Sequence, residues 1–138
     1  SVQGNEQRGL LHCQLEVPGH DQVHAVCVHL GLREAHRQRQ VKLLLDLLDS
    51  LPPKAPVIVA GDFNDWRLKA DAVLCEHLVE AFGEHFGTPA RSFPARLPLL
   101  RLDRIYLRNA MPGSAQVLSK YPWSHLSDHA PLASEINL

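Results

Sequence analysis

One short apolar run, with polar residues directly after it, constrains the fold more than any other feature of the sequence. Residues 57–60 are Val-Ile-Val-Ala, and Gly61 and Asp62 come next. An uninterrupted run of this kind predicts a strand that is buried on both faces, because a strand with one solvated face would alternate apolar and polar residues. Such a strand lies inside a covered sheet. The run therefore favours a layered α/β domain.

Turn and helix signals on either side indicate how the rest of that sheet is connected. Residues 9–17 and 22–30 are apolar-rich and enclose a turn-forming group, which predicts a β-hairpin. Apolar residues then recur at helical spacing from residue 33 to a pair of prolines after residue 51. A second helix is expected over residues 69–81. Further strands are expected over residues 102–107, 115–118 and 131–136. Hairpins and crossovers are mixed, so we predict an α/β fold with one mixed sheet and helices on one face.

The composition fits one globular unit and excludes a strong overall field. The chain has 138 residues, of which 45% are hydrophobic, enough to bury one core. Its 14 basic and 15 acidic residues give a net charge of −1, so any binding of a polyanion must be local. No apolar run approaches the roughly 20 residues that cross a bilayer, and the polar N-terminus lacks the apolar segment of a secretory signal.

The cysteines point to a reducing environment. Cys13, Cys27 and Cys75 form no CxxC pair, which makes a zinc site unexpected. An odd number of cysteines fits free thiols better than a disulfide framework. We therefore expect three buried free thiols and a cytoplasmic protein.

Polar residues cluster where the predicted apolar strands begin or end. Each one alone has an ordinary explanation as a turn or capping residue. Ligand sites of layered sheets, however, lie at strand ends, where loops bring distant side chains together. The residues concerned are His29, Asp62, Asn64, Asp103, Asp128 and His129.

The segments around these residues resemble the sequential motifs of a known superfamily. They are VHL at 28–30, GDFN at 61–64, LDRIY at 102–106 and SDHAPL at 127–132. Taken in order, they resemble the endonuclease/exonuclease/phosphatase superfamily, whose fold is DNase I-like. The stretch 92–108 is similar to a bacterial branch of it. The resemblance implies that residues 1–138 are a single partial domain, the C-terminal half of a four-layer α/β sandwich.

The same resemblance implies a phosphoesterase of the phosphodiesterase or nuclease type. Cleavage of a phosphate ester needs an activated water and neutralisation of the charge on the phosphate oxygens. Asp62 would orient or deprotonate the water, and Asn64 would help to fix it. With Asp128, these two residues would also hold Mg²⁺ or Mn²⁺, which prefer hard oxygen ligands.

Two histidines would face the phosphate. The resemblance implies that His129 donates to it and stabilises the developing negative charge, while Asp103 fixes the orientation and protonation of the imidazole. His29 would be the second phosphate-facing histidine. The motifs leave the phosphate-ester substrate open, with nucleic acid, nucleotides and phospholipid headgroups as candidates.

One departure from the family pattern affects the expected activity. In the family, an Asn and a metal-binding Glu come from the first half of the domain, and neither Glu6 nor Glu16 has the surrounding pattern of that glutamate. We therefore expect the N-terminal half to be absent, the fragment to be inactive alone, and an apolar face to seek that half or a self-association partner. The alternative is a non-catalytic domain that retains the fold and binds a phosphorylated partner or another protein.

Basic and aromatic residues allow two interpretations each. Two tryptophans, Trp66 and Trp123, either flank the cleft or pack in the core or at its rim. Five arginines either form a basic strip beside the phosphate site or face water individually. These are Arg91, Arg96, Arg101, Arg104 and Arg108.

Overall fold

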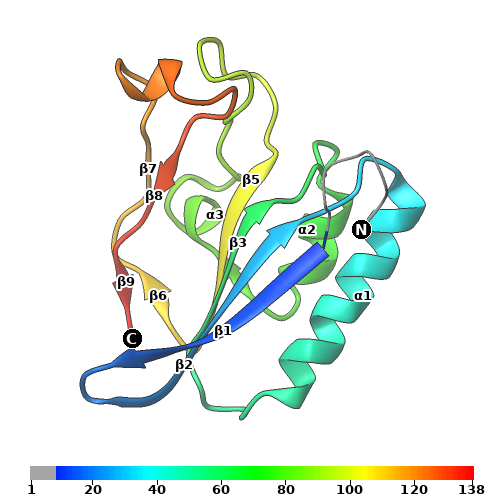
Figure 1. The fold of residues 1–138 in the computed structure, drawn as a ribbon, viewed down its shortest axis with the longest axis vertical. Helices are drawn as coiled ribbons and strands as arrows, with labels where there is room; N and C mark the ends of the chain where they lie inside the picture. The colour runs from blue at the N-terminus through cyan, green and yellow to red at the C-terminus, as the bar shows by residue number, and fades with distance from the viewer. Residues whose placement is uncertain (1–8) are drawn as a thin grey trace.

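A computed structural model describes residues 9–138, so Glu6 lies outside the described residues. The chain forms a twisted sheet with one long helix against it, and several loops gather at one end of the strands (Figure 1). Within the described part, no helix has the length and apolar character that a membrane crossing requires.

The predicted mixed sheet is confirmed. Strands β1 (Gly9–Val17) and β2 (His20–His29) form the expected antiparallel hairpin, and β3 (Val57–Asp62) runs parallel to β2. Strand β5 (Asp103–Arg108) is antiparallel to β3 and carries the short edge strand β4 (Val79–Glu80). The sheet order is therefore β1-β2-β3-β5-β4.

Helix α1 (Glu34–Ser50) covers one face of this sheet. It provides the crossover that a parallel pair such as β2 and β3 requires. Its apolar stripe, which includes Leu44 and Leu48, packs with Val26 and Val59 in the main core. The helix ends where the sequence predicts, next to Leu51 and the two prolines.

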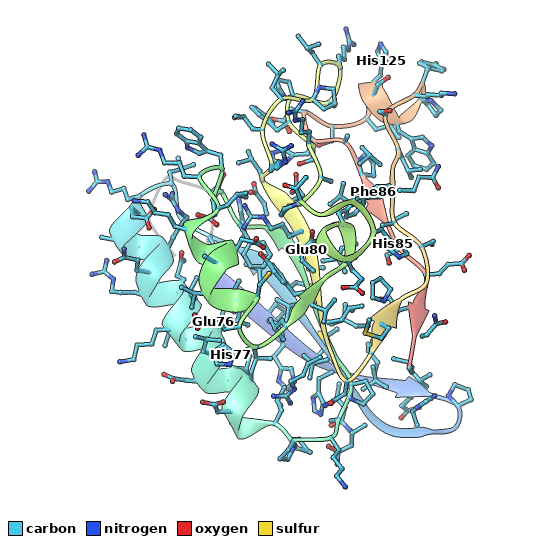
Figure 2. All side chains as sticks on the ribbon, turned by 180° about the vertical axis from the view of Figure 1, so that it is seen from behind. Glu76, His77, Glu80, His85, Phe86 and His125 are labelled. Carbon is cyan, nitrogen blue, oxygen red and sulfur yellow. The ribbon has the colours of Figure 1, made fainter. Side chains whose placement is uncertain are left out.

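The second expected helix is wrong beyond its first turns. Helix α2 covers only Lys69–Leu74, after which the chain forms β4 and then a separate helix, α3 (Ala81–Phe86). Pairing with β5 takes Val79 and Glu80 out of the helix. The Glu80 carboxylate then caps α3 by accepting from two of its backbone N–H groups, and Figure 2 shows Glu80 at this junction.

Helix α3 also departs from the expectation that the helices share one face. Phe82 packs with Ile105, whose side chain points away from the α1 side because neighbouring Tyr106 belongs to the main core. The C-terminal segment covers the same region through two small sheets, and the single strand expected over 131–136 is divided between them. Their strands are β6 (Met111–Pro112) with β9 (Ile136–Asn137), and β7 (Gln116–Val117) with β8 (Leu132–Ala133).

Beyond that region, the sheet face opposite α1 is open. The run 57–60 is thus fully buried on one face only, because Ile58 and Ala60 are half-buried where Val57 and Val59 are completely buried. Leu11, which is 62% exposed, lies opposite Cys27 on this open sheet face. The open sheet face consists of Leu11, Cys13, Leu15, Ala25, Cys27, Ile58 and Ala60.

The expectation of buried cysteines is wrong. Cys13 and Cys27 are exposed because their register places them on the open sheet face, and Cys75 is exposed just after α2. Apolar character alone did not reveal which face of the hairpin is covered.

Candidate active site

All six residues that the sequence singles out line one open pocket of about 470 Å³. It lies at the end of the sheet where β2 and β3 finish and β5 begins. The structure adds one apolar residue, Leu32, which the sequence did not indicate. The lining residues are His29, Leu32, Asp62, Asn64, Asp103, Asp128 and His129.

Strand register explains why three of these side chains meet. Asp62 is paired with His29 on β2 and with Asp103 on β5, so the three central strands reach the pocket at the same level. Gly61 permits this close pairing. Its φ is +145°, and a Cβ there would lie 2.0 Å from the carbonyl oxygen of Val28. The glycine of the GDFN motif is thus required by backbone approach.

The loop after β3 fixes Asn64 by two hydrogen bonds. Its backbone N–H donates to Asp62 Oδ1 at 2.9 Å, which supports a left-handed backbone with a φ of 49°. Its side-chain Nδ2 donates to the carbonyl oxygen of Leu30 at 2.8 Å. Because the nitrogen is engaged in this way, the amide oxygen is the atom that Asn64 can offer to a cation.

His129 is held by a carboxylate and packed against an aromatic ring. Its Nδ1 lies 2.5 Å from Asp103 Oδ2, which also accepts from Ser92 Oγ at 2.6 Å. The ring of Phe93 lies 4.9 Å from the imidazole. Nε2 lies 3.7 Å from Asp62 Oδ2, so the second ring nitrogen is presented to the pocket.

The surrounding charges favour the protonated form of His129. Partial burial on its own would lower the pKa of this imidazole. The hydrogen bond to Asp103 and the negative charges of Asp103, Asp62 and Asp128 outweigh that effect and raise the pKa above its ordinary value. A protonated His129 can donate to a phosphate oxygen from Nε2.

For Asp62, burial is the effect that decides the direction of the pKa shift. Burial raises the pKa of its carboxyl, and the nearby carboxylate of Asp103 adds to that rise. The backbone N–H of Asn64 and the two histidines oppose it but do not cancel it. A carboxylate whose pKa moves toward neutrality becomes a better proton acceptor.

Replacing Asp103 with Asn is expected to lower the pKa of His129, because it removes the negative charge that stabilises the imidazolium. The pKa of His129 is measured by an NMR titration of its ring signals. Since the native pKa is raised, ionisation of His129 stabilises the fold at low pH, and that contribution fades as the pH rises through the native value. Asp49→Asn on α1 is the matched control and should leave the His129 titration in place. A His129 pKa that stays the same or rises in Asp103→Asn would contradict the pairing.

The pocket also has the donors that a divalent cation needs. Asp62, Asp103 and His129 can each bring one ligand atom within 4.8 Å of the others. Nδ1 of His129 is, however, already bonded to Asp103, which favours Asp62 and the pocket-lining Asp128 as the cation ligands. Carboxylate and amide oxygens fit Mg²⁺ or Mn²⁺. The metal set Asp62, Asn64 and Asp128 stays a prediction.

A buried ion pair that the sequence did not predict joins two segments that contribute residues to this pocket. Arg104 is 1% exposed, and its Nη1 donates to Asp65 Oδ2 at 2.9 Å. Asp65 also accepts from the backbone N–H groups of Lys69 and Asp71, and so caps α2. The pair thus ties the loop that carries Asn64 to strand β5. A signal existed in the sequence, since Asp65 stands a few residues before the helix expected from residue 69.

Arg104 also shows that the five arginines do not form one basic strip. Arg108 donates to the carbonyl oxygen of Leu48, under α1, whereas Arg91 and Arg96 are exposed in the loop before β5. Arg104 and Arg108 lie on strand β5 and bond to groups of the fold, whereas Arg91 and Arg96 lie in the preceding loop, so closeness in sequence did not place these charges together.

Comparison with known proteins identifies the family and the fold of the chain. Residues 7–129 match the Endonuclease/Exonuclease/phosphatase family. The chain is 52% identical over 141 residues to the "Uncharacterized protein YbhP" of Escherichia coli (strain K12), and the alignment covers all of this chain and 56% of that protein. The chain thus spans about half the length of this curated relative.

Solved structures show the same fold at low sequence identity. A functionally unknown conserved protein from Enterococcus faecalis V583 superposes with a TM-score of 0.77 at 20% identity, over 92% of this chain and 55% of the other. D. rerio TDP2 complexed with single strand DNA product gives a TM-score of 0.73 at 21% identity, over 94% and 61%. With the sequence match over most of its length, the chain belongs to the endonuclease/exonuclease/phosphatase family.

Proposed function

We propose that this chain carries the main catalytic residues of a divalent-metal-dependent phosphoesterase of the phosphodiesterase or nuclease type. The observation that carries the proposal is the position of His129. Its Nδ1 is bonded to Asp103 at 2.5 Å while its Nε2 faces Asp62 across the pocket at 3.7 Å. A proton donor and a proton acceptor thus lie side by side at the open pocket, where both can contact one bound phosphate and its attacking water.

The residues of the chain divide the proton transfers between them. Asp62, whose pKa is raised, takes a proton from the attacking water as the water's oxygen bonds to phosphorus and the bond from phosphorus to the leaving ester oxygen breaks; the leaving oxygen takes up a proton from solvent. His129 donates a hydrogen bond to a non-bridging oxygen, and Asp103 keeps its imidazole protonated and oriented. A Mg²⁺ or Mn²⁺ ion held by Asp62, Asn64 and Asp128 would supply further neutralisation of the phosphate charge.

His29 has a supporting position. Its Nε2 lies 4.0 Å from Asp62 Oδ2, and its side chain is partly exposed to the pocket. In this proposal it is the second histidine that faces the phosphate. The two histidines approach the Asp62 carboxylate from different segments, His29 from the end of β2 and His129 from the loop before β8.

The proposal extends to what lies beyond this chain. Residues 1–138 are taken as one part of the catalytic domain, and a further carboxylate ligand comes from outside it. The open sheet face is where another layer, or a second copy, would pack.

Single-stranded nucleic acid is one substrate candidate, because the D. rerio TDP2 neighbour holds a single strand DNA product. A cytoplasmic location is part of the same proposal and is supported by three exposed thiols.

Hydrolysis of bis-p-nitrophenyl phosphate tests the activity. The chain alone is compared with the chain joined to the part of the 52%-identical relative that it does not match. We expect hydrolysis by the joined protein to require Mg²⁺ or Mn²⁺, to stop with EDTA and to exceed that of the chain alone. Equal rates would contradict the divided site. A joined protein that binds phosphate compounds but cleaves none would favour the non-catalytic binding domain.

Self-association of the isolated chain tests the open sheet face. We expect the chain to dimerise, and Leu11→Ser with Leu15→Ser to weaken the dimer by at least about tenfold, because two apolar side chains would no longer be buried. Light scattering after size-exclusion chromatography measures the mass. Leu43→Ser on the exposed side of α1 is the control. A parent chain that elutes as a monomer at every concentration would contradict the prediction.

A further inference from the structure

Two loops at the pocket end of the sheet carry exposed apolar side chains. We name residues 93–100 and 120–126 the rim loops. In Figure 1 both project from the same end of the molecule, and the label of His125 in Figure 2 marks the 3-10 helix η1 (Trp123–His125) within the second loop. Their large apolar residues are between 36% and 79% exposed. They are Leu97, Leu99, Leu100, Tyr121, Trp123 and Leu126.

Backbone hydrogen bonds connect the first rim loop, and Ser92 next to it, to the segment that carries Asp128 and His129. The N–H of Ala95 donates to the carbonyl oxygen of Asp128 at 2.8 Å, and the N–H of Ala130 donates to the carbonyl oxygen of Ser92 at 2.7 Å. Whatever docks on these loops is therefore held at the mouth of the pocket that contains Asp128 and His129.

Backbone hydrogen bonds connect residues within the first rim loop, which carries the exposed leucines. Phe93 and Leu100 exchange backbone hydrogen bonds, and the N–H of Leu97 donates to the carbonyl oxygen of Pro94 at 3.2 Å. Leu97 is nevertheless 66% exposed. A backbone that holds large apolar side chains outward is typical of an interaction surface, because loop tips that meet only water are normally polar.

The rim loops carry positive charge. The rim loops contain one arginine and one lysine but no Asp or Glu, although the whole chain carries a net charge of −1. Both basic residues, Arg96 and Lys120, are exposed in the same loops as the apolar residues. Such a surface suits a partner that is anionic and also has an apolar phase.

We propose that the rim loops dock the protein on an anionic phospholipid bilayer. The leucines and aromatic rings enter the boundary between headgroups and acyl chains, and the basic residues meet the lipid phosphates. The inference rests on the proposed function only for its substrate, which becomes a phospholipid headgroup ester delivered to the pocket at the membrane surface.

A bilayer fits these loops better than single-stranded nucleic acid does. Bases stack on aromatic rings, so a nucleic-acid surface is expected to present aromatic platforms along a basic groove. Here the aliphatic side chains Leu97, Leu99 and Leu126 are 57–67% exposed, more than Trp123 at 42%. Aliphatic side chains gain little from stacking but gain directly from burial among acyl chains.

Vesicle binding tests the surface. We expect the protein to sediment with vesicles of phosphatidylcholine and phosphatidylglycerol and much less with phosphatidylcholine alone. Leu97→Ser with Leu99→Ser should weaken binding by at least about tenfold, and Arg96→Gln by about fivefold at low salt. Leu43→Ser, another exposed leucine, should have no effect. Loss of binding in Leu11→Ser as large as in the rim variant would overturn the proposal, because the open sheet face would then be the docking site.

Tryptophan emission locates the inserted residue. The chain has two tryptophans, so Trp66→Phe leaves Trp123 on the rim as the single reporter. Its emission should shift to shorter wavelength when anionic vesicles are added. An unchanged emission with vesicles, together with quenching by single-stranded DNA, would overturn the bilayer in favour of nucleic acid.

The binding assay is independent of catalysis. A joined protein that binds anionic vesicles but cleaves no ester supports the docking surface and contradicts the proposed function. Hydrolysis of a soluble diester without any vesicle binding overturns the docking surface and leaves the proposed function in place. Thermal unfolding of each rim variant confirms that a loss of binding is not a loss of fold.

Discussion

Alanine in place of His129 is expected to lower kcat/KM for diester hydrolysis by roughly a thousandfold in the metal-loaded, joined protein. The substitution removes the donor to the phosphate oxygen and leaves Asp103 without its imidazole partner. The effect should fall on kcat, because charge on the non-bridging oxygens grows most in the transition state.

Steady-state kinetics on bis-p-nitrophenyl phosphate measure this effect. The matched control is His77→Ala, which removes an exposed histidine that follows α2 (Figure 2) and does not line the pocket. It should change kcat/KM by less than about twofold, as expected of a surface substitution. If His129→Ala retained most of the activity, or raised only KM, His129 would not be the group that stabilises the transition state.

Arg104→Met is expected to destabilise the fold by about 3–5 kcal/mol. Arg104 and Asp65 are both buried, and removing the guanidinium leaves a buried carboxylate without its charged partner. The pair holds the start of α2 and the loop of Asn64 against β5, so the same variant should also weaken metal-dependent hydrolysis.

Urea unfolding measures the free energy, and a double variant identifies its origin. In Arg104→Met with Asp65→Asn, the buried charge is gone, so we expect part of the lost stability to return. The exposed Arg39 on α1 gives the control Arg39→Met, which should cost less than about 0.5 kcal/mol. A double variant less stable than the sum of the two single variants would contradict a charge effect.

The central strands could be predicted from the sequence because their signals are local. The run 57–60, the turn after residue 17 and the prolines after residue 51 each act over a few residues. The helix expected over 69–81 failed because Val79 and Glu80 pair with β5, which lies far along the chain. Helical spacing of apolar residues could not reveal that competing partner.

In the candidate site too, local signals could be interpreted from the sequence and long-range contacts could not. All of its lining residues except Leu32 could be predicted, because they stand close to the ends of recognisable strands and strand ends meet at one edge of a sheet. Ser92, which donates to Asp103, comes from a loop without periodicity, and no local pattern marks it. Asp65 and Arg104 lie 39 positions apart, so their pairing depends on the register of β5 against β3.

The two sides of the pocket are anchored with different strength. Asp62 and Asp103 face each other on paired central strands, whereas the segment with Asp128 and His129 is followed only by the two-residue strands β8 and β9. Amide hydrogen exchange should therefore be slowest at Val59 and much faster at Ala130. A local opening that withdraws the imidazole while the sheet stays folded would let temperature or a bound ligand regulate turnover without global unfolding.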